Sequence, residues 1–344
     1  MKTYTLKVAG IKRETEDAVT LCFKQPGLKK IKYQAGQYLT LIFRINGRRY
    51  LRPYSFSSTP IVDSFLEVTV KRVPNGIVSN YVNDKVVIGD VIEVLEPMGD
   101  FIYPKENSFA TIFLWGVGSG VTPLFSLLKF ILNEESLKDS RVHLIYGNHN
   151  IDSSIFWDAL HILQNQNSER FKITHFHTRS EKNENPSISI HGRIQPESIL
   201  KLYDSNLIKE SLHYICGPVD LKRNIRNILS SYNLDTNQIL IEDFELEKNP
   251  NDFIGVETQK ITLDFDNKVF DIEVLKGKSI LEAALDADIE LPYSCQTGNC
   301  NTCKGILKNG KSKMIGINKP EDLLEDEFLL CCTYPITENV YIKI

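Results

Sequence analysis

The 344-residue sequence lacks several features that would point to particular classes of protein. Its first residues, MKTYTLKVAGIKRETEDAV, alternate apolar and polar side chains without a continuous apolar core, so no secretory signal peptide is predicted. No low-complexity tract and no solenoid-type repeat is present. An excess of positive charge is also absent, because 40 Lys and Arg stand against 44 Asp and Glu. The net charge of −4 therefore gives no reason to expect nucleic acid as the main partner.

One stretch, residues 109–132, is long enough to cross a membrane. It is interrupted by three glycines, by Pro123 and by Lys129, and its β-branched first half differs from its leucine-rich second half. This pattern predicts a buried strand, a tight turn and a helix rather than a membrane span. The seven cysteines form an odd number, and without an export signal they indicate a reducing compartment, here the cytoplasm. In such a compartment clustered cysteines are more often metal ligands or catalytic groups than disulfides.

The length predicts two or three domains, because single hydrophobic cores stop growing near about 250–300 residues. Residues 1–104 contain many short β-rich runs separated by turn signals, which predicts a small antiparallel β-barrel. Residues 105–245 alternate apolar strands with helix-compatible stretches, which predicts a parallel sheet with helices on both faces. Residues 246–258 are polar and contain a proline, as a linker would. Residues 259–344 combine a hairpin, a helix, a cysteine loop and a final strand, which predicts an α+β domain.

The cysteine loop, CQTGNCNTC at residues 295–303, has the spacing C-x4-C-x2-C. A zinc site usually consists of two separated cysteine pairs, and no histidine stands near this single triplet. The spacing, followed by a distant cysteine, is that of a plant-type [2Fe–2S] cluster. Two irons take four thiolates, so a tight loop can supply three of them and a distant segment the fourth. Zinc and an unligated thiol cluster remain the alternatives, and either cysteine of the pair 331–332 is available as the fourth ligand.

The stretch LPYSCQTGNCNTCKGIL together with FLLCCTYPIT resembles the plant-type ferredoxin domain, which has a β-grasp fold. In that family the fourth ligand precedes a tail ending in Tyr-Pro or His-Pro. The resemblance therefore implies Cys331 as the ligand and Cys332 as an ordinary neighbour. The implied iron ligands are Cys295, Cys300, Cys303 and Cys331. Glu327 stands near a position where the family often has glycine, which affects a turn and none of the ligands.

The motif RPYSFSS occupies residues 52–58. Its plain interpretation is a barrel strand with incidental polar residues. It resembles the flavin signature of the ferredoxin–NADP reductase superfamily, and KRVPNGIVSNYV, residues 71–82, resembles the phosphate loop of its FAD-binding branches. EPMGDF, residues 96–101, resembles the segment that closes the barrel, although Glu96 replaces the usual glycine. The resemblance implies that FAD is bound by Arg52, Pro53, Tyr54, Ser55, Val70, Lys71, Gly76, Val78 and Ser79.

The stretch GVGSGVTP, residues 116–123, follows a predicted strand and precedes a predicted helix, as a phosphate-binding turn does. It differs from the dinucleotide fingerprint G-x-G-x-x-G and resembles the nicotinamide-binding turn of the same superfamily. YICGPVDL, residues 214–221, resembles the segment that places a cysteine beside the nicotinamide ring; a small core side chain is the plain alternative for Cys216. The implied NAD(P)H-binding residues are Gly116, Gly118, Gly120, Thr122, Pro123, Cys216, Gly217 and Pro218. Ser55, Thr122 and Cys216 are the implied hydride-transfer residues.

Three further predictions rest on single positions. Thr178 and Arg179 match the place where NADPH-using relatives bind the 2′-phosphate, so NADPH is favoured over NADH. Phe244 is the candidate for the aromatic residue that relatives place near the flavin. His175 and His177 alternate on a strand, but no third ligand stands nearby in the sequence, so no metal is predicted there.

The resemblance covers essentially the whole chain and implies the reductase component of a multicomponent oxygenase. Electrons would pass from NAD(P)H to FAD, then to the [2Fe–2S] cluster, and then to a partner oxygenase or another acceptor protein. The acidic run at residues 321–327 is either a solvated surface or a docking face for that partner. A stand-alone NAD(P)H dehydrogenase that reduces quinones and a non-catalytic redox sensor are the alternative functions.

Overall fold

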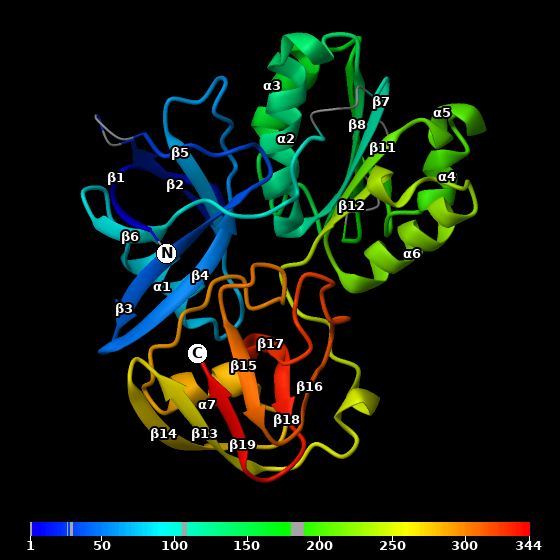
Figure 1. Ribbon diagram of the computed structural model, residues 1–344. Helices are drawn as coiled ribbons and strands as arrows, with labels where there is room; N and C mark the ends of the chain where they lie inside the picture. The colour runs from blue at the N-terminus through cyan, green and yellow to red at the C-terminus, as the bar shows by residue number, and fades with distance from the viewer. Residues whose placement is uncertain (1, 26, 28–29, 105–108, 180–188) are drawn as a thin grey trace. The chain divides into compact units, whose positions relative to one another are not determined.

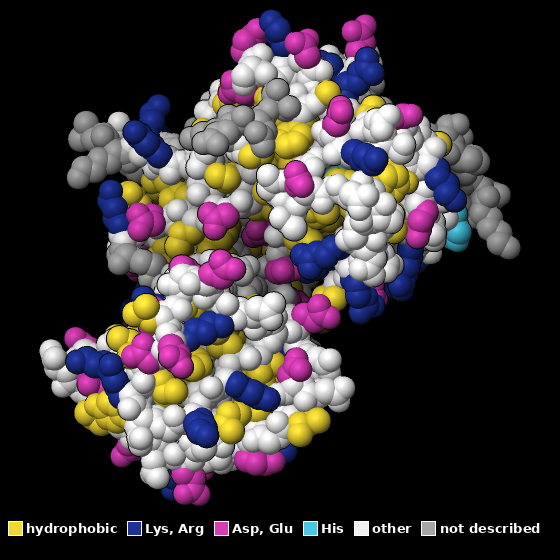
Figure 2. All heavy atoms as spheres, turned by 45° about the vertical axis from the view of Figure 1, so that its right-hand side comes forward, with side chains coloured by type: hydrophobic (Ala, Val, Ile, Leu, Met, Phe, Trp, Pro, Cys, Tyr) yellow, Lys and Arg dark blue, Asp and Glu magenta, His cyan; other side chains and the backbone are white. Residues whose placement is uncertain are grey.

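The computed structural model describes residues 2–25, 27, 30–104, 109–179 and 189–344. The chain divides into two compact units (Figure 1). Unit 1 comprises Met1–Leu41 and Tyr54–Glu242, and unit 2 comprises Ile42–Pro53 and Asp243–Ile344. Lys and Arg side chains are interspersed with Asp and Glu side chains on the face seen in Figure 2, in keeping with the small net charge of −4.

The first sheet is antiparallel and has the strand order β4-β3-β6-β1-β2-β5. An isolated antiparallel bridge between Phe56, just after β4, and Val68, in β5, connects the two edges of this sheet, so the sheet curls as a barrel does. The helix α1 (Ile77–Lys85) follows β5. The predicted antiparallel flavin barrel is confirmed. Its strands are β1 (Thr3–Thr15), β2 (Ala18–Lys24), β3 (Tyr38–Ile45), β4 (Arg48–Ser55), β5 (Leu66–Lys71) and β6 (Val91–Leu95).

The second sheet is parallel and has the strand order β10-β9-β8-β7-β11-β12. Its strands are β7 (Thr111–Val117), β8 (Arg141–Asn148), β9 (Phe171–His177), β10 (Ile190–His191), β11 (Leu212–Cys216) and β12 (Ile239–Glu242). The helices are α2 (Val121–Asn133), α3 (Trp157–Gln166), α4 (Pro196–Leu200), α5 (Ser205–Lys209) and α6 (Val219–Ser230). Residues of β7 face two opposite cores: Ile112 packs with α2 and α3, and Trp115 packs with the helices α4 to α6. Helices therefore cover both faces, as predicted (Figure 1).

The third sheet lies in unit 2 and has the strand order β14-β13-β19-β15-β17. Its strands are β13 (Gln259–Phe265), β14 (Lys268–Val274), β15 (Lys304–Asn309), β17 (Glu327–Leu329) and β19 (Val340–Lys343), and β16 (Ser312–Met314) pairs with β18 (Thr333–Pro335) in a separate ribbon. The predicted hairpin turn is present, because Asp266 and Asn267 both adopt positive φ, at 54° and 58°. Ser279 caps the helix α7 (Ile280–Asp286) through a capping box with Glu282. A helix packed on a mixed sheet confirms the α+β ferredoxin-type domain.

Part of the predicted linker packs against the last domain. Val256, only 1% exposed, belongs to a small core with Ile315 and Tyr334, and Phe253 packs against it. The predicted domain boundaries stay a prediction, and the one between residues 104 and 105 borders residues 105–108, which lie outside the described part of the chain. Within the described residues, no helix is long and apolar enough to cross a membrane. The apolar stretch 109–132 forms β7, a turn and α2 instead.

Three histidines are buried in the domain of the parallel sheet, and the pKa of each is lowered. Burial lowers the pKa of His143, His175 and His213 to about 3 each, and nearby positive charge from Lys172 or from neighbouring imidazoles adds to this for the first two. His213 accepts a hydrogen bond from the Trp115 indole at 3.1 Å, so its Nδ1 is the unprotonated nitrogen. The neutral imidazole is therefore the folded form of each side chain at neutral pH.

These histidines predict a loss of stability in mild acid. Between pH 6.5 and 3 the unfolded chain binds more protons at these positions than the folded chain, so the free energy of unfolding falls as the pH falls. For three such groups the loss is about 4 kcal/mol between about pH 7 and 5.5. Thermal unfolding of the loaded protein at these two pH values checks this expectation. A His213→Phe variant should show about one third less pH dependence, whereas an unfolding free energy that does not change between the two pH values would contradict the expectation.

Candidate cofactor sites

The four predicted cluster ligands form two pairs in unit 2. The thiols of Cys295 and Cys300 are linked by a hydrogen bond, and so are those of Cys303 and Cys331. Cys295, Cys303 and Cys331 are between 3% and 8% exposed. A [2Fe–2S] cluster takes two thiolates on each of its two irons, so a two-and-two grouping of thiols, three buried and Cys300 partly exposed, fits it. In the described ranges, no group of three or more His, Cys, Asp or Glu side chains is arranged to hold a single metal ion.

The backbone of the cysteine loop curls around the first pair. Gly298 has φ +81°, and a Cβ at this position would lie 2.5 Å from the Ile317 side chain. The Thr297 N–H donates to the Cys295 sulfur at 3.4 Å, and the Cys295 N–H donates to the Cys300 sulfur at 3.5 Å. The Cys300 thiol and the backbone N–H groups of Thr297 and Asn299 lower the pKa of Cys295 to about 5. The loop thus presents hydrogen-bond donors that stabilise negative charge on sulfur, which a cluster of thiolates and sulfides requires.

The two adjacent cysteines contact each other but differ in their other partner. The Cys331 thiol also bonds that of Cys303, whereas the fully buried Cys332 thiol donates to the Leu329 carbonyl at 3.2 Å. This arrangement supports Cys331 as the fourth ligand. Glu327, where the family often has glycine, bonds Lys304 at 2.7 Å and accepts the Leu324 N–H at 3.1 Å. It closes the preceding turn, and its bonds to Lys304 and to this backbone donor lower the pKa of its carboxyl.

The flavin motif occupies the end of β4. Ser55 is buried, and Arg52 donates to the Leu51 carbonyl at 2.8 Å. Arg52 and Pro53 group with unit 2, whereas Tyr54 and Ser55 group with unit 1. The predicted contact residues Val70, in β5, and Val78, in α1, are at most 2% exposed.

The predicted phosphate loop leads into α1. Gly76 stands at the N-cap of this nine-residue helix and provides no side-chain cap, and a Cβ at Gly76 would lie 2.5 Å from the Ser79 hydroxyl. Ser79 accepts the Val73 N–H at 3.1 Å and so holds the loop against the helix. Lys71, at the end of β5, lies 3.6 Å from Asp17. Uncapped N–H groups and the helix dipole favour an anion here, which fits the phosphates of FAD.

The two predicted nicotinamide segments meet at one point of the parallel sheet. β7 and β11 are neighbours, with Gly116 paired to Cys216. A Cβ at Gly120 would lie 2.7 Å from the Cys216 carbonyl carbon and overlap its oxygen, so only glycine permits this approach. After β7 the chain adds β8, β9 and β10 on one side of β7 and then places β11 and β12 on its other side, so the strand order reverses between β7 and β11. In open α/β sheets, ligands bind outside the carboxyl ends of the strands at such a reversal.

The remaining residues of the turn lie at the same sheet edge. Gly118 has φ +56°, and the Thr122 hydroxyl donates to the Ser119 carbonyl at 2.9 Å, so both hold the turn in place. Pro123 follows in the first turn of α2, and Gly217 and Pro218 lead from β11 into α6, where Pro218 is the N-cap. Cys216 is 1% exposed. Of these residues Gly118 and Gly217 are partly exposed and Pro218 is exposed, whereas Gly116, Gly120, Thr122, Pro123 and Cys216 are buried, so the nicotinamide contacts stay a prediction.

The residues predicted to select NADPH follow β9. The Thr178 N–H donates to the Asn148 carbonyl at 3.1 Å, and the Arg179 N–H donates to the His149 carbonyl at 2.7 Å. Both residues therefore lie at the carboxyl edge of the sheet, with β8 between them and the glycine-rich turn. Phe244 is 46% exposed and belongs to unit 2.

Two contacts in this region could not be found by sequence reasoning. The fully buried Tyr146 hydroxyl donates to the Gly118 carbonyl at 3.1 Å, across from β8 to the turn after β7. His161 of α3 stacks on His175 with ring centroids 5.2 Å apart and is a third imidazole near the predicted pair. No signal in the sequence marks either residue, because both contacts depend on which strands and helices pack together.

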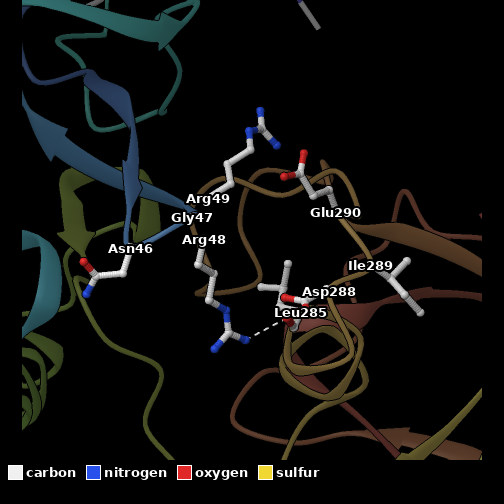
Figure 3. Close-up of a pocket in the computed structure, with 8 residues that line it drawn as sticks. All are labelled: Asn46, Gly47, Arg48, Arg49, Leu285, Asp288, Ile289 and Glu290. Atoms are coloured by element: carbon white, nitrogen blue, oxygen red, sulfur yellow. Dashed lines mark hydrogen bonds between the residues drawn. The ribbon is translucent and has the colours of Figure 1, made fainter.

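Unit 2 also contains an open pocket of about 500 Å³ between the β3–β4 hairpin and α7 (Figure 3). Arg48 spans it and donates to the Leu285 carbonyl at 2.6 Å. The pocket is lined by Asn46, Gly47, Arg48, Arg49, Leu285, Asp288, Ile289 and Glu290. Since no predicted cofactor residue lines it, the pocket is not part of the cofactor sites.

Three family models match the chain in the predicted order. They are an oxidoreductase FAD-binding domain at residues 5–103, an oxidoreductase NAD-binding domain at residues 114–227 and a 2Fe-2S iron-sulfur cluster binding domain at residues 264–336. These domains define an NAD(P)H-dependent iron–sulfur flavoprotein oxidoreductase, with FAD, a nicotinamide nucleotide and a [2Fe–2S] cluster as cofactors. Such a chain passes electrons from NAD(P)H through FAD to the cluster.

Relatives of known name match over nearly the whole chain. The ferredoxin reductase component of 3-ketosteroid-9-alpha-monooxygenase from Mycolicibacterium smegmatis is 30% identical over 97% of this chain and 95% of its own. One of the subunits of 1,2-phenylacetyl-CoA epoxidase from Escherichia coli is 29% identical over 98% of this chain and 97% of its own. The solved structure of phthalate dioxygenase reductase shares the fold, with a TM-score of 0.70, 23% identity and coverage of 99% and 98%. The chain belongs to the family of ferredoxin reductase components of oxygenases.

Proposed function

We propose that this protein is the cytoplasmic reductase component of an oxygenase system and that it takes its electrons from NADPH. The observation that carries the proposal is the match, over 97% of the chain, to a named oxygenase reductase component. The seven free thiols, four of them grouped for a cluster, support a reducing compartment. Thr178 and Arg179 at the carboxyl edge of the sheet support NADPH, because a guanidinium binds a 2′-phosphate through two hydrogen bonds.

The protein's own residues contribute binding and placement in this function. Bound FAD supplies the conversion of a two-electron donor into single electrons, which the [2Fe–2S] cluster relays. Gly116, Gly118 and Gly120 allow the backbone to approach the nucleotide, and Ser55, Thr122 and Cys216 are proposed to border the position of hydride transfer. The four cysteines named above are proposed to hold the cluster, with Cys331 as the distant ligand. Phe244 remains the proposed aromatic neighbour of the flavin.

Anaerobic stopped-flow mixing tests this function. We expect NADPH to bleach the flavin absorbance first and the cluster absorbance next, within seconds, and NADH to act more slowly because it lacks the 2′-phosphate. A purified oxygenase partner should then reoxidise the cluster faster than a small quinone does. If neither nucleotide bleaches the cluster, the electron-transfer function is wrong; if quinones reoxidise it as fast as any protein acceptor, a stand-alone dehydrogenase is the better interpretation.

A further inference from the structure

Three hydroxyl-bearing residues follow the flavin strand and have no part in the sites described so far. Ser57, Ser58 and Thr59 are completely buried, although their side chains are polar. Burial of a hydroxyl is costly unless it is hydrogen-bonded. The Ser57 and Ser58 hydroxyls find their partners inside the barrel, Ser57 with Thr69 and Ser58 with Tyr33 and the Glu67 N–H, whereas among the described residues the Thr59 hydroxyl has none.

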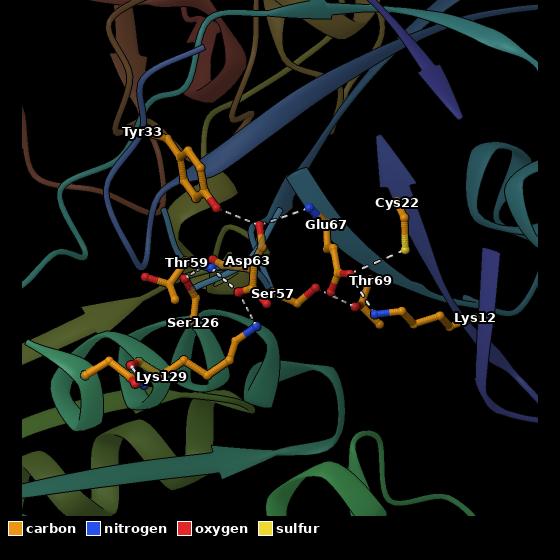
Figure 4. A network of polar contacts seen from close by, with 12 residues as sticks. Lys12, Cys22, Tyr33, Ser57, Thr59, Asp63, Glu67, Thr69, Ser126 and Lys129 are labelled. Atoms are coloured by element: carbon orange, nitrogen blue, oxygen red, sulfur yellow. Dashed lines mark hydrogen bonds and ion pairs between the residues drawn. The ribbon is translucent and has the colours of Figure 1, made fainter. Parts of the chain in front are cut away.

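The segment 58–63 has a further partner outside the barrel, the helix α2 of the parallel-sheet domain, and the network is shown in Figure 4. The Ser126 hydroxyl donates to the Ser58 carbonyl at 2.5 Å, and Ser126 is also completely buried. One turn further along α2, the Lys129 ammonium lies 2.6 Å from an oxygen of Asp63. The Thr59 N–H donates to the same Asp63 oxygen at 2.7 Å. All of these residues belong to unit 1, so the contacts lie inside one compact body.

The barrel approaches the same helix a second time through a glycine loop. The Gly36 N–H points to the Ser126 hydroxyl at 3.4 Å. Gly36 has φ +91°, and a Cβ there would lie 3.3 Å from Leu127 of α2 and overlap the Phe101 carbonyl. Only glycine fits this approach, so the contact between the barrel and α2 is closely packed on both sides of Ser126.

The helix α2 joins this anchor to the nicotinamide turn. It begins at Val121, directly after the glycine-rich turn, and Thr122, Ser126 and Lys129 lie at positions i, i+4 and i+7 on one face. A helix transmits displacement along its axis, because its backbone hydrogen bonds keep its length fixed. The anchored segment 58–63 begins three residues after Ser55. A single rigid element therefore connects the proposed nicotinamide position to the proposed flavin position.

We propose that Ser126 and Lys129 are positioning residues that set the separation between the nicotinamide turn and the flavin strand. The inference rests on the proposed placement of the two cofactors at these segments. Hydride transfer requires the reacting atoms to be within about 3–3.5 Å, and a displacement of about 1 Å can cost about 100-fold in rate. Loosening the anchor should therefore slow hydride transfer without removing a group that touches either cofactor.

Of the two ways to break the ion pair between Lys129 and Asp63, Lys129→Met is the clearer test. Lys129 is 9% exposed at its side chain and Asp63 is 22% exposed. Removal of the lysine leaves Asp63 with the Thr59 N–H and some contact with water, whereas removal of Asp63 would leave a buried cation without its partner. Ser126→Ala removes the second contact with almost no change in volume. The contacts of Ser126 with Ser58 and of Lys129 with Asp63 together form the anchor. Each single variant removes one of these contacts, and the double variant removes both.

The experiment compares these variants with the wild type as loaded enzymes. We expect the rate of flavin reduction at saturating nucleotide to fall about 10-fold in each single variant and further in the double variant. The nucleotide Kd and the contents of flavin and iron should change less than about 3-fold, because no proposed cofactor contact is altered. Amide hydrogen exchange of peptides covering residues 56–65 and 121–133 should become about 10-fold faster, which reports the loosened anchor independently of activity.

Lys12→Met is a control on the barrel side of the same network. Lys12 lies 2.6 Å from the Glu67 side chain, and the Glu67 N–H donates to the Ser58 hydroxyl, so the substitution breaks an ion pair beside the segment while both contacts with α2 stay intact. It should leave the rate of flavin reduction unchanged. Lys129→Arg, which keeps the positive charge, should recover most of the rate lost in Lys129→Met.

Two outcomes would overturn the inference. In the first, the variants exchange amides faster but reduce flavin at the wild-type rate, so the anchor is structural only. In the second, the Lys12→Met control slows reduction as much as Lys129→Met does, so the effect is not specific to α2. If the double variant fails to fold, Ser126→Ala alone decides between these results. A wild type that shows no flavin reduction would instead contradict the proposed function itself.

Discussion

A Gly120→Ala variant should lose rapid reduction by NAD(P)H while it keeps its flavin and its cluster. The added Cβ would lie 2.7 Å from the carbonyl carbon of Cys216 and 3.2 Å from the Gly217 nitrogen. These are backbone atoms, so no side-chain rotation can relieve the overlap, and the ends of β7 and β11 must move apart. Since both strands end in proposed nicotinamide segments, we expect flavin reduction to slow about 100-fold.

Stopped-flow reduction and cofactor analysis measure this effect. Gly10→Ala is the control, because a Cβ there would meet only the Cys22 side chain, at an ordinary 3.6 Å, in the barrel. The control should reduce its flavin at the wild-type rate. Wild-type kinetics in Gly120→Ala would show that the two turns do not need this close approach, and the proposed nicotinamide site would then be wrong.

The second large effect concerns the adjacent cysteines. Cys331→Ser should abolish the [2Fe–2S] absorbance, because it removes the thiol that bonds Cys303 and that is proposed as the fourth of the four thiolates a cluster requires. Cys332→Ser should retain the cluster, because that thiol bonds the Leu329 carbonyl, which a serine hydroxyl can also do. We expect the Cys331 variant to contain FAD and to reduce it normally with NADPH.

Iron and sulfide analysis, together with the visible spectrum, distinguishes the two cysteines. The pair serves as its own control, since both are buried and both substitutions replace sulfur with oxygen. Loss of the cluster in Cys332→Ser alone would reverse the ligand assignment. Loss of the cluster in both variants would mean that the segment 330–332 tolerates no change. The assignment of Cys331 as the fourth ligand would then lose its support.

The parts of this fold that depend on short stretches of sequence were predicted well. The hairpin at residues 259–274 was predicted from an Asp-Asn turn, and both turn residues adopt positive φ. The helix that begins after Ser279 was predicted from a serine at its start, and the capping box is present. Alternating strands and helices predicted the parallel sheet with two covered faces. In each case the determining interactions lie within a few residues of one another, so the local pattern contains them.

Other features depend on residues far apart in the chain. Ser126 and Ser58 are 68 residues apart, and Lys129 and Asp63 are 66 apart. Nothing in either local pattern indicates that these side chains meet, because a buried serine in a helix and an aspartate in a turn have many ordinary explanations. The third imidazole beside His175 and the tyrosine beside Gly118 were missed for the same reason. The linker prediction also overlooked that Val256 packs in a core.

The spacing of the cysteines indicated the iron–sulfur cluster, and the resemblance of three ordered motifs to those of a known superfamily implied FAD and a nicotinamide nucleotide. The tertiary structure decided how those patterns are joined. It grouped the cysteines as two pairs, brought Gly120 against the backbone of Cys216, and anchored α2 to the segment after β4. These are contacts between distant segments, and they follow from the packing of whole strands and helices rather than from any local sequence.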